Sequence, residues 1–133
     1  MPSNVDALWA YAQKMPDVCE ESCRAKISRA YYALFHEAKV FHDQLTSPGF
    51  LPAKPGGLHK KIIHQLCNPT VTDEGLQTKS RGAGTKLGLA RELRDLADYE
   101  LGQPVAKSDV TNCLGFVRRG LQDLRTPVKS SAA

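Results

Sequence analysis

The sequence predicts an all-α fold, an antiparallel bundle of four main helices plus a short helix. Apolar residues recur at helical spacing in five segments, and no segment alternates apolar and polar residues as a strand does. Clusters of proline and glycine separate these segments. A chain of 133 residues is long enough for one core and too short for two. We therefore predict a single helical domain over residues 1–126 and a disordered tail over residues 127–133.

The first two helices are expected over residues 4–14 and 17–45. Ser3 followed by Asp6 is typical of a helix N-cap with an acidic first turn, and Pro16 separates the two helices. The second helix has one apolar face, which predicts the side that packs into the core. That face consists of Ile27, Tyr31, Leu34, Ala38, Phe41 and Leu45.

The rest of the chain is predicted to contain two loops and three helices. Three prolines and three glycines favour a loop over residues 46–57, and a short helix is expected over residues 58–67. The polar segment over residues 70–85 contains three more glycines and is predicted to be a second loop. A helix over residues 87–101 follows, and the last helix begins at the N-cap Ser108.

The charge balance is mildly basic. The excess of 18 Lys and Arg over 14 Asp and Glu gives a net charge of +4, which suits a polyanionic partner without requiring one. No apolar run is long enough for a transmembrane helix or for the hydrophobic region of a signal peptide. We therefore expect a cytosolic protein without a membrane partner.

The cysteines do not predict a disulfide framework. No two of the four cysteines are separated by two residues as in a CxxC motif, and nothing in the sequence indicates secretion. The four are Cys19, Cys23, Cys67 and Cys113. We interpret all four as reduced thiols, with metal binding as the alternative. The sequence predicts no metal site and no cofactor.

Arg29 and His36 share one stripe of the second helix. Because they are seven positions apart, they differ by about 20° around the helix axis and by roughly 10 Å along it. The stripe lies about 160° from the apolar face, so both side chains are expected to point away from the core. Small, aromatic and basic residues adjoin the stripe and are predicted to form an interaction surface with it. These residues are Tyr32, Ala33, Lys39 and Val40. The spacing alone is also compatible with two solvated surface residues.

Three parts of the sequence together carry a resemblance to a known family. The string Ser28-Arg29-Ala30-Tyr31-Tyr32-Ala33-Leu34-Phe35-His36-Glu37-Ala38 is similar to the signature helix of the HEPN domain family, in which an arginine precedes a histidine by four to six intervening residues. Six residues intervene here. The family's glycine-rich approach to a histidine resembles Gly56-Gly57-Leu58-His59, and a later family segment resembles residues 89–99, which end in Arg94-Asp95-Leu96-Ala97-Asp98-Tyr99.

The resemblance implies a metal-independent endoribonuclease that is a homodimer. In that case His36 takes a proton from a ribose 2′-hydroxyl and Arg29 stabilises the phosphorane. Both residues then lie in a cleft between two subunits. Tyr32, Lys39 and Arg94 are the expected substrate-binding residues, with Tyr32 stacking on a base. Family habit further implies a toxin or defence setting.

Several other residues have two interpretations. Lys79, Arg81 and Lys86 are expected to form a basic loop that either grips phosphates or is merely solvated. His59 is interpreted either as an RNA contact or as a structural residue. An ion pair between Arg94 and Asp98, four residues apart, is the structural alternative for Arg94.

One departure concerns regulation. HEPN toxins with a nucleotidyltransferase antitoxin commonly carry a tyrosine two residues before the histidine, where this chain has Leu34. An antitoxin of this kind is therefore a possible partner, but this chain lacks the tyrosine that such an antitoxin usually modifies. The alternative function is a non-catalytic HEPN module that binds a nucleotide or a partner protein and dimerises. A plain helical scaffold ranks third.

Overall fold

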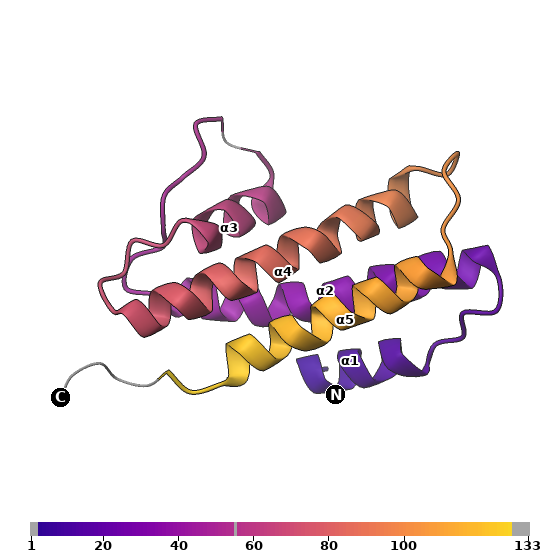
Figure 1. The fold of residues 1–133 in the computed structure, drawn as a ribbon, viewed down its shortest axis with the longest axis horizontal. Helices are drawn as coiled ribbons and strands as arrows, with labels where there is room; N and C mark the ends of the chain where they lie inside the picture. The colour runs from indigo at the N-terminus through magenta and orange to yellow at the C-terminus, as the bar shows by residue number, and fades with distance from the viewer. Residues whose placement is uncertain (1–2, 55, 129–133) are drawn as a thin grey trace.

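The computed structural model describes residues 3–54 and 56–128, and it confirms the all-α fold (Figure 1). Within these ranges there is no strand. The helices are α1 (Val5–Lys14), α2 (Glu20–Gln44), α3 (Leu58–Cys67), α4 (Glu74–Tyr99) and α5 (Lys107–Arg125).

Three long helices form the centre of the bundle. α2, α4 and α5 pack against one another, α1 packs on α2, and α3 packs mainly on α4. In Figure 1, α1 and α4 run in one direction, whereas α2, α3 and α5 run in the other. α2 and α3 share a direction because the segment over residues 45–57 returns along the bundle before α3 begins. α2 lies behind α4 and α5 in this view.

The predicted apolar face of α2 is buried. Ile27, Tyr31, Leu34 and Ala38 are fully buried, while Phe41 and Leu45 pack at the edge of the core. Opposite Leu34, α5 presents Gly120, where a Cβ atom would lie 2.8 Å from a Leu34 methyl group. This close approach brings α2 and α5 together.

The prediction of a loop over residues 70–85 is wrong, because α4 begins at Glu74. Asp73 is the N-cap, and its carboxylate accepts a hydrogen bond of 2.9 Å from the main-chain N–H of Leu76. The glycines lie inside the helix. A Cβ atom at Gly84 would lie 2.9 Å from the main-chain nitrogen of Cys67, so glycine permits α3 and α4 to pack closely.

Smaller errors concern the helix ends. α2 begins at Glu20 rather than at Asp17, and α5 has Ala106 as its N-cap rather than Ser108. The Asp109 carboxylate accepts a hydrogen bond of 2.9 Å from the Ala106 N–H, which explains the earlier start. α4 ends before Leu101, which is 76% exposed.

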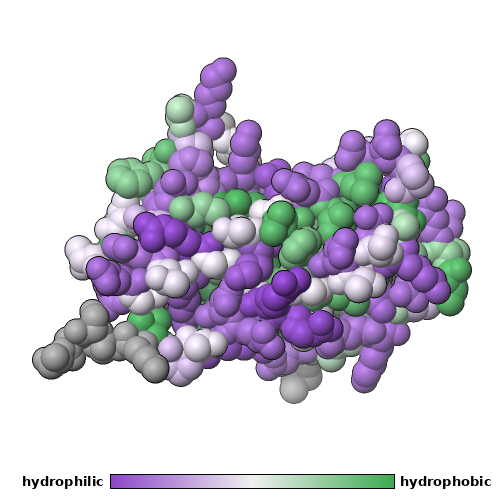
Figure 2. Space-filling model, in the orientation of Figure 1, coloured by the Kyte–Doolittle hydropathy of each residue, from purple (hydrophilic) through white to green (hydrophobic). Residues whose placement is uncertain are grey.

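The chain continues beyond α5 as non-helical Pro127 and Val128. Residues 129–133 of the predicted disordered tail lie outside the described residues. None of the described helices combines the length and apolar character needed to cross a membrane. Hydrophilic side chains cover most of the face seen in Figure 2, with small hydrophobic groups between them.

Candidate functional site

Arg29 and His36 lie on the face of α2 that points away from the core. Arg29 is exposed, and within the described part of the chain its side chain makes no ion pair or hydrogen bond. His36 is half-buried against the start of α1. A shallow pocket there is lined by His36 together with Ser3, Asn4, Val5 and Leu8. Both side chains are therefore available to a ligand or a second subunit.

Tyr32 lies between the two residues of the stripe along α2. It follows Arg29 by one turn and precedes His36 by one turn, and its ring centroid lies 4.8 Å from that of His36. The Tyr32 side chain remains 41% exposed. An aromatic face beside a histidine and an arginine is an arrangement that can stack a nucleic-acid base.

The prediction that Ala33 is part of this exposed surface is wrong, because Ala33 is fully buried. Lys26, on the same side of α2, donates hydrogen bonds of 3.2 and 2.9 Å to two main-chain carbonyl groups at the C-terminal end of α1. Glu37 pairs with Arg125, which also pairs with Asp6 of α1 at 2.8 Å. α1 therefore covers the side of α2 that contains Ala33.

Lys39 is on α2 beyond His36, but it pairs with Asp43 at 2.7 Å. Its charge is therefore partly neutralised, and a phosphate would have to compete with this carboxylate. Val40, in the next position, is 55% exposed, as predicted for the mixed surface.

Arg94 lies on α4 and contacts α2 residues outside the stripe of Arg29 and His36. Its Nε atom is 2.9 Å from an oxygen of Asp98, which also accepts a hydrogen bond of 3.1 Å from Ser28. The guanidinium lies 5.6 Å from the centroid of the Tyr31 ring and 5.1 Å from that of Tyr99. Arg94 therefore braces α4 against α2, and no contact in the described chain joins it to Arg29 or His36.

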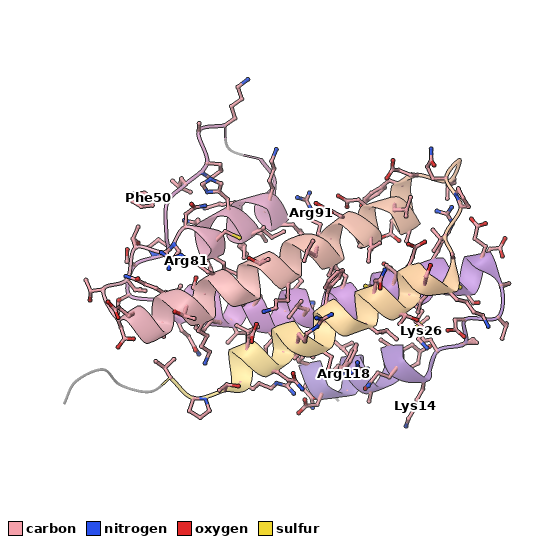
Figure 3. The ribbon with its side chains drawn as sticks, viewed as in Figure 1. Lys14, Lys26, Phe50, Arg81, Arg91 and Arg118 are labelled. Atoms are coloured by element: carbon pink, nitrogen blue, oxygen red, sulfur yellow. The ribbon has the colours of Figure 1, made fainter. Side chains whose placement is uncertain are left out.

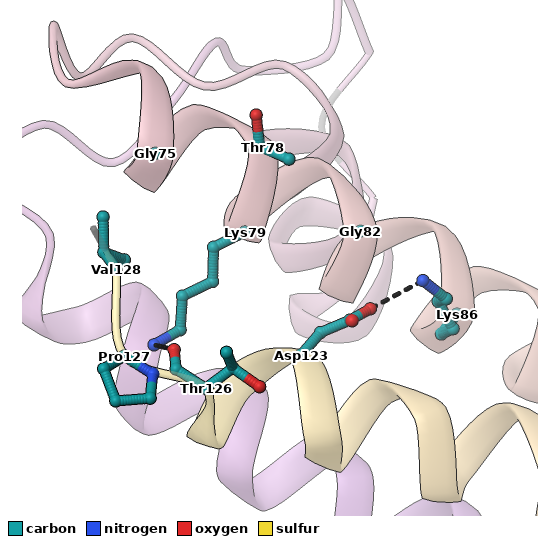
Figure 4. Close-up of a pocket in the computed structure, with 9 residues that line it drawn as sticks. All are labelled: Gly75, Thr78, Lys79, Gly82, Lys86, Asp123, Thr126, Pro127 and Val128. Carbon is teal, nitrogen blue, oxygen red and sulfur yellow. Dashed lines mark hydrogen bonds and ion pairs between the residues drawn. The ribbon is translucent and has the colours of Figure 1, made fainter. Parts of the chain in front are cut away.

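Lys79, Arg81 and Lys86 lie on α4, and so the prediction of a basic loop is wrong. Lys86 pairs with Asp123 at 2.6 Å, and Lys79 donates a hydrogen bond of 3.1 Å to the carbonyl of Thr126 (Figure 4). Both lysines line a pocket between α4 and the end of α5. Their contacts join α4 to α5. Arg81 is exposed on α4.

His59 has contacts that the sequence did not reveal. Its Nδ1 atom lies 2.6 Å from the hydroxyl oxygen of Tyr31, and its ring stacks on that of Phe35 at 3.8 Å. The sequence contained a partial signal, because Tyr31 and Phe35 are one turn apart on α2. The partner helix could not be known until the direction of α3 was known.

The other two histidines have structural partners. The Nε2 atom of His42 is 2.8 Å from the side-chain oxygen of Gln65. The Nδ1 atom of His64 is 2.9 Å from the main-chain carbonyl oxygen of Phe50. These contacts fix α3 and the preceding loop to the bundle.

The thiols and the titratable residues are dispersed. Cys23 and Cys113 are buried, Cys19 is exposed and Cys67 is intermediate, and all four are free. Burial raises the pKa of the Cys113 thiol to about 12, so this side chain remains a neutral thiol. Among the described residues, no group of three His, Cys, Asp or Glu side chains could hold a metal ion.

A search for relatives finds no matching family model, no similar curated protein and no similar solved structure.

Proposed function

We propose that this protein is a HEPN-type, metal-independent endoribonuclease that acts as a homodimer. The observation that supports this most is the outward stripe of α2. A fixed cation, Arg29, and a titratable base, His36, lie there with the exposed ring of Tyr32 between them. The resemblance of this helix to the HEPN signature supplies the reaction class.

The proposed reaction uses only side chains of the protein. Neutral His36 removes the proton from a ribose 2′-hydroxyl, and the 2′-oxygen attacks the adjacent phosphorus. Arg29 stabilises the negative charge of the phosphorane. The bond from phosphorus to the 5′-oxygen then breaks. The departing oxygen takes up a proton from water, and His36 returns to solvent the proton that it removed. The products are a 2′,3′-cyclic phosphate and a free 5′-hydroxyl.

A second copy of the chain completes the proposed site. In one chain Arg29 and His36 are separated by roughly 10 Å along α2, which is too far for both to act easily on one phosphate. Two antiparallel α2 helices related by a two-fold axis near Tyr32 would bring Arg29 of one subunit close to His36 of the other. Since α1 covers Ala33, the two helices would meet across the Tyr32 rings instead of through small residues.

The first test concerns metal ions. Cleavage of a single-stranded RNA is expected to continue at an unchanged rate in excess EDTA, because the proposed base and the proposed cation are both side chains. The rate is measured by gel electrophoresis of a labelled RNA with and without chelator. Loss of cleavage in EDTA that is restored by added Mg²⁺ or Mn²⁺ would contradict this mechanism.

The second test concerns the shared site. A mixed dimer of one Arg29→Ala chain and one His36→Ala chain, purified by two different tags, retains one intact pair across the interface. We expect about half of the wild-type activity, because one of two symmetric sites is restored. The two single-variant homodimers are the matched controls and should be inactive. A mixed dimer as inactive as those controls would show that each site belongs to one chain.

We also propose that the protein acts in a toxin or defence system. An antitoxin of the nucleotidyltransferase type would need a target other than position 34, because Leu34 has no hydroxyl group and is fully buried.

A further inference from the structure

His59 begins a chain of ring contacts that leads to the proposed catalytic histidine. Its ring stacks on Phe35 with an interplanar angle of 12°, and Phe35 contacts His36 edge-on at a centroid distance of 5.9 Å. Tyr31 also contacts His59, with ring centroids 5.6 Å apart and its hydroxyl oxygen 2.6 Å from Nδ1. His59 is therefore fixed in position beside the α2 surface.

The contact with Tyr31 determines which nitrogen of His59 carries the hydrogen. Tyr31 is fully buried, so its hydroxyl hydrogen needs an acceptor, and His59 Nδ1 is the hydroxyl's hydrogen-bonding partner within the described chain. Burial also raises the pKa of Tyr31, so this hydroxyl keeps its proton. A neutral imidazole that accepts at Nδ1 carries its hydrogen on Nε2. His59 is therefore a donor at Nε2.

The surroundings of His59 keep it neutral. Burial lowers its pKa, and the positive charges of Arg94 and Arg91 act in the same direction, while Asp95 opposes them. Nε2 has no hydrogen-bond partner among the described residues, and it is not one of their fully buried side-chain nitrogens. The Nε2–H group is therefore accessible to solvent.

The charge around this donor suits a phosphate. Arg91 projects from α4 beside the beginning of α3 (Figure 3), and α3 carries the exposed Lys60 and Lys61 in its first turn. The sequence contains no aspartate or glutamate from residue 44 to residue 72. Asp95 is an opposing charge, 3.8 Å from Arg91 Nε. Positive charge therefore predominates on the α3 side of the donor.

We propose that His59 Nε2–H binds a phosphate oxygen of the RNA strand, next to the nucleotide that lies on Tyr32. This inference rests on the proposed ribonuclease function and assigns a substrate-binding residue outside the α2 motif. His59 and His36 lie near each other, since both rings contact Phe35, at centroid distances of 3.8 and 5.9 Å. Arg91 then provides the neighbouring positive charge, and Tyr32 provides the stacking surface.

The test measures RNA binding apart from cleavage. The probe is a fluorescein-labelled, single-stranded 2′-O-methyl oligonucleotide, which attack by a 2′-hydroxyl cannot cut. His59→Phe keeps a flat ring on Phe35 but removes the donor, and it is expected to weaken binding in fluorescence anisotropy about tenfold. His59→Gln places an amide N–H near the position of Nε2 and is expected to stay within about twofold of wild type. His59→Asn places its amide near Nδ1 and should bind as weakly as the phenylalanine variant.

The outcomes separate this inference from the proposed function. Wild-type affinity in both His59→Phe and His59→Asn, with unchanged helical circular dichroism, overturns the role of His59 even if the protein cleaves RNA. If His59→Phe does not fold, equal affinities of the glutamine and asparagine variants overturn it instead. Binding that depends on His59 in a protein that never cleaves RNA supports this inference and contradicts the proposed enzyme.

Discussion

Replacing either Arg29 or His36 with alanine is expected to reduce RNA cleavage by at least about a hundredfold. A general base typically contributes a factor of 10²–10⁴ to a rate, and a group that stabilises developing charge contributes a similar factor. Neither side chain belongs to the core, and so the fold should persist. Initial cleavage rates with a labelled RNA, measured beside thermal unfolding by circular dichroism, test both parts of this expectation.

A matched control separates catalysis from loss of charge. Arg118 is an exposed arginine on α5, and Arg118→Ala removes the same charge as Arg29→Ala. The control should retain wild-type activity, and all three variants should unfold within about 1 kcal/mol of wild type. Wild-type cleavage by the Arg29 or the His36 variant would refute the assigned roles. Equal losses in the Arg118 control would point to general electrostatic attraction instead.

The largest loss of stability is expected for Arg24→Met. The Arg24 side chain is only 10% exposed and pairs with Glu20 at 2.7 Å. Its Nη1 atom donates hydrogen bonds of 3.0 and 2.9 Å to the carbonyls of Leu96 and Ala97 at the end of α4. Methionine fills a similar volume but leaves these buried acceptors without their donor. The expected cost is about 3 kcal/mol, or roughly 10 °C in the unfolding midpoint.

Urea unfolding measures this loss, and Arg24→Lys is its control. Lysine retains the charge, but one ammonium group cannot reproduce the planar fork that contacts several carbonyl groups. It should therefore recover only part of the lost stability. If Arg24→Met lowers the free energy of unfolding by less than about 1 kcal/mol, with an unchanged slope against urea concentration, water hydrogen-bonds the carbonyl groups at the end of α4 as well as Arg24 does.

The sequence predicted the local features of the fold better than its contacts between helices. The apolar face of α2 followed from spacing alone, and with it the outward direction of Arg29 and His36. The beginning of α4 did not follow from the sequence pattern, because Gly82 and Gly84 have a low helix propensity. At Gly84 the close contact with Cys67 makes glycine suitable inside that helix. Only the packing of α3 on α4 reveals this reason.

The candidate site shows the same division. The contact between Tyr32 and His36 follows from their spacing on one helix. The burial of Ala33 depends on where α1 packs, and the bond between His59 and Tyr31 depends on the direction of α3. The burial of Arg24 could be predicted in part from the sequence, because Arg24 lies seven residues before Tyr31 and thus on the buried face of α2.

The 2′-hydroxyl at the cleaved bond is the most direct test of the proposed reaction. An RNA with one preferred cleavage position is compared with the same RNA carrying a single 2′-deoxynucleotide on the 5′ side of that bond. Mass spectrometry should find a 2′,3′-cyclic phosphate and a 5′-hydroxyl from the all-ribose RNA. No cleavage is expected at the deoxy position, and none in either RNA with His36→Ala. Equal cleavage of the two RNAs, or products with a 3′-hydroxyl and a 5′-phosphate, would contradict the assignment of Arg29 and His36 to this chemistry.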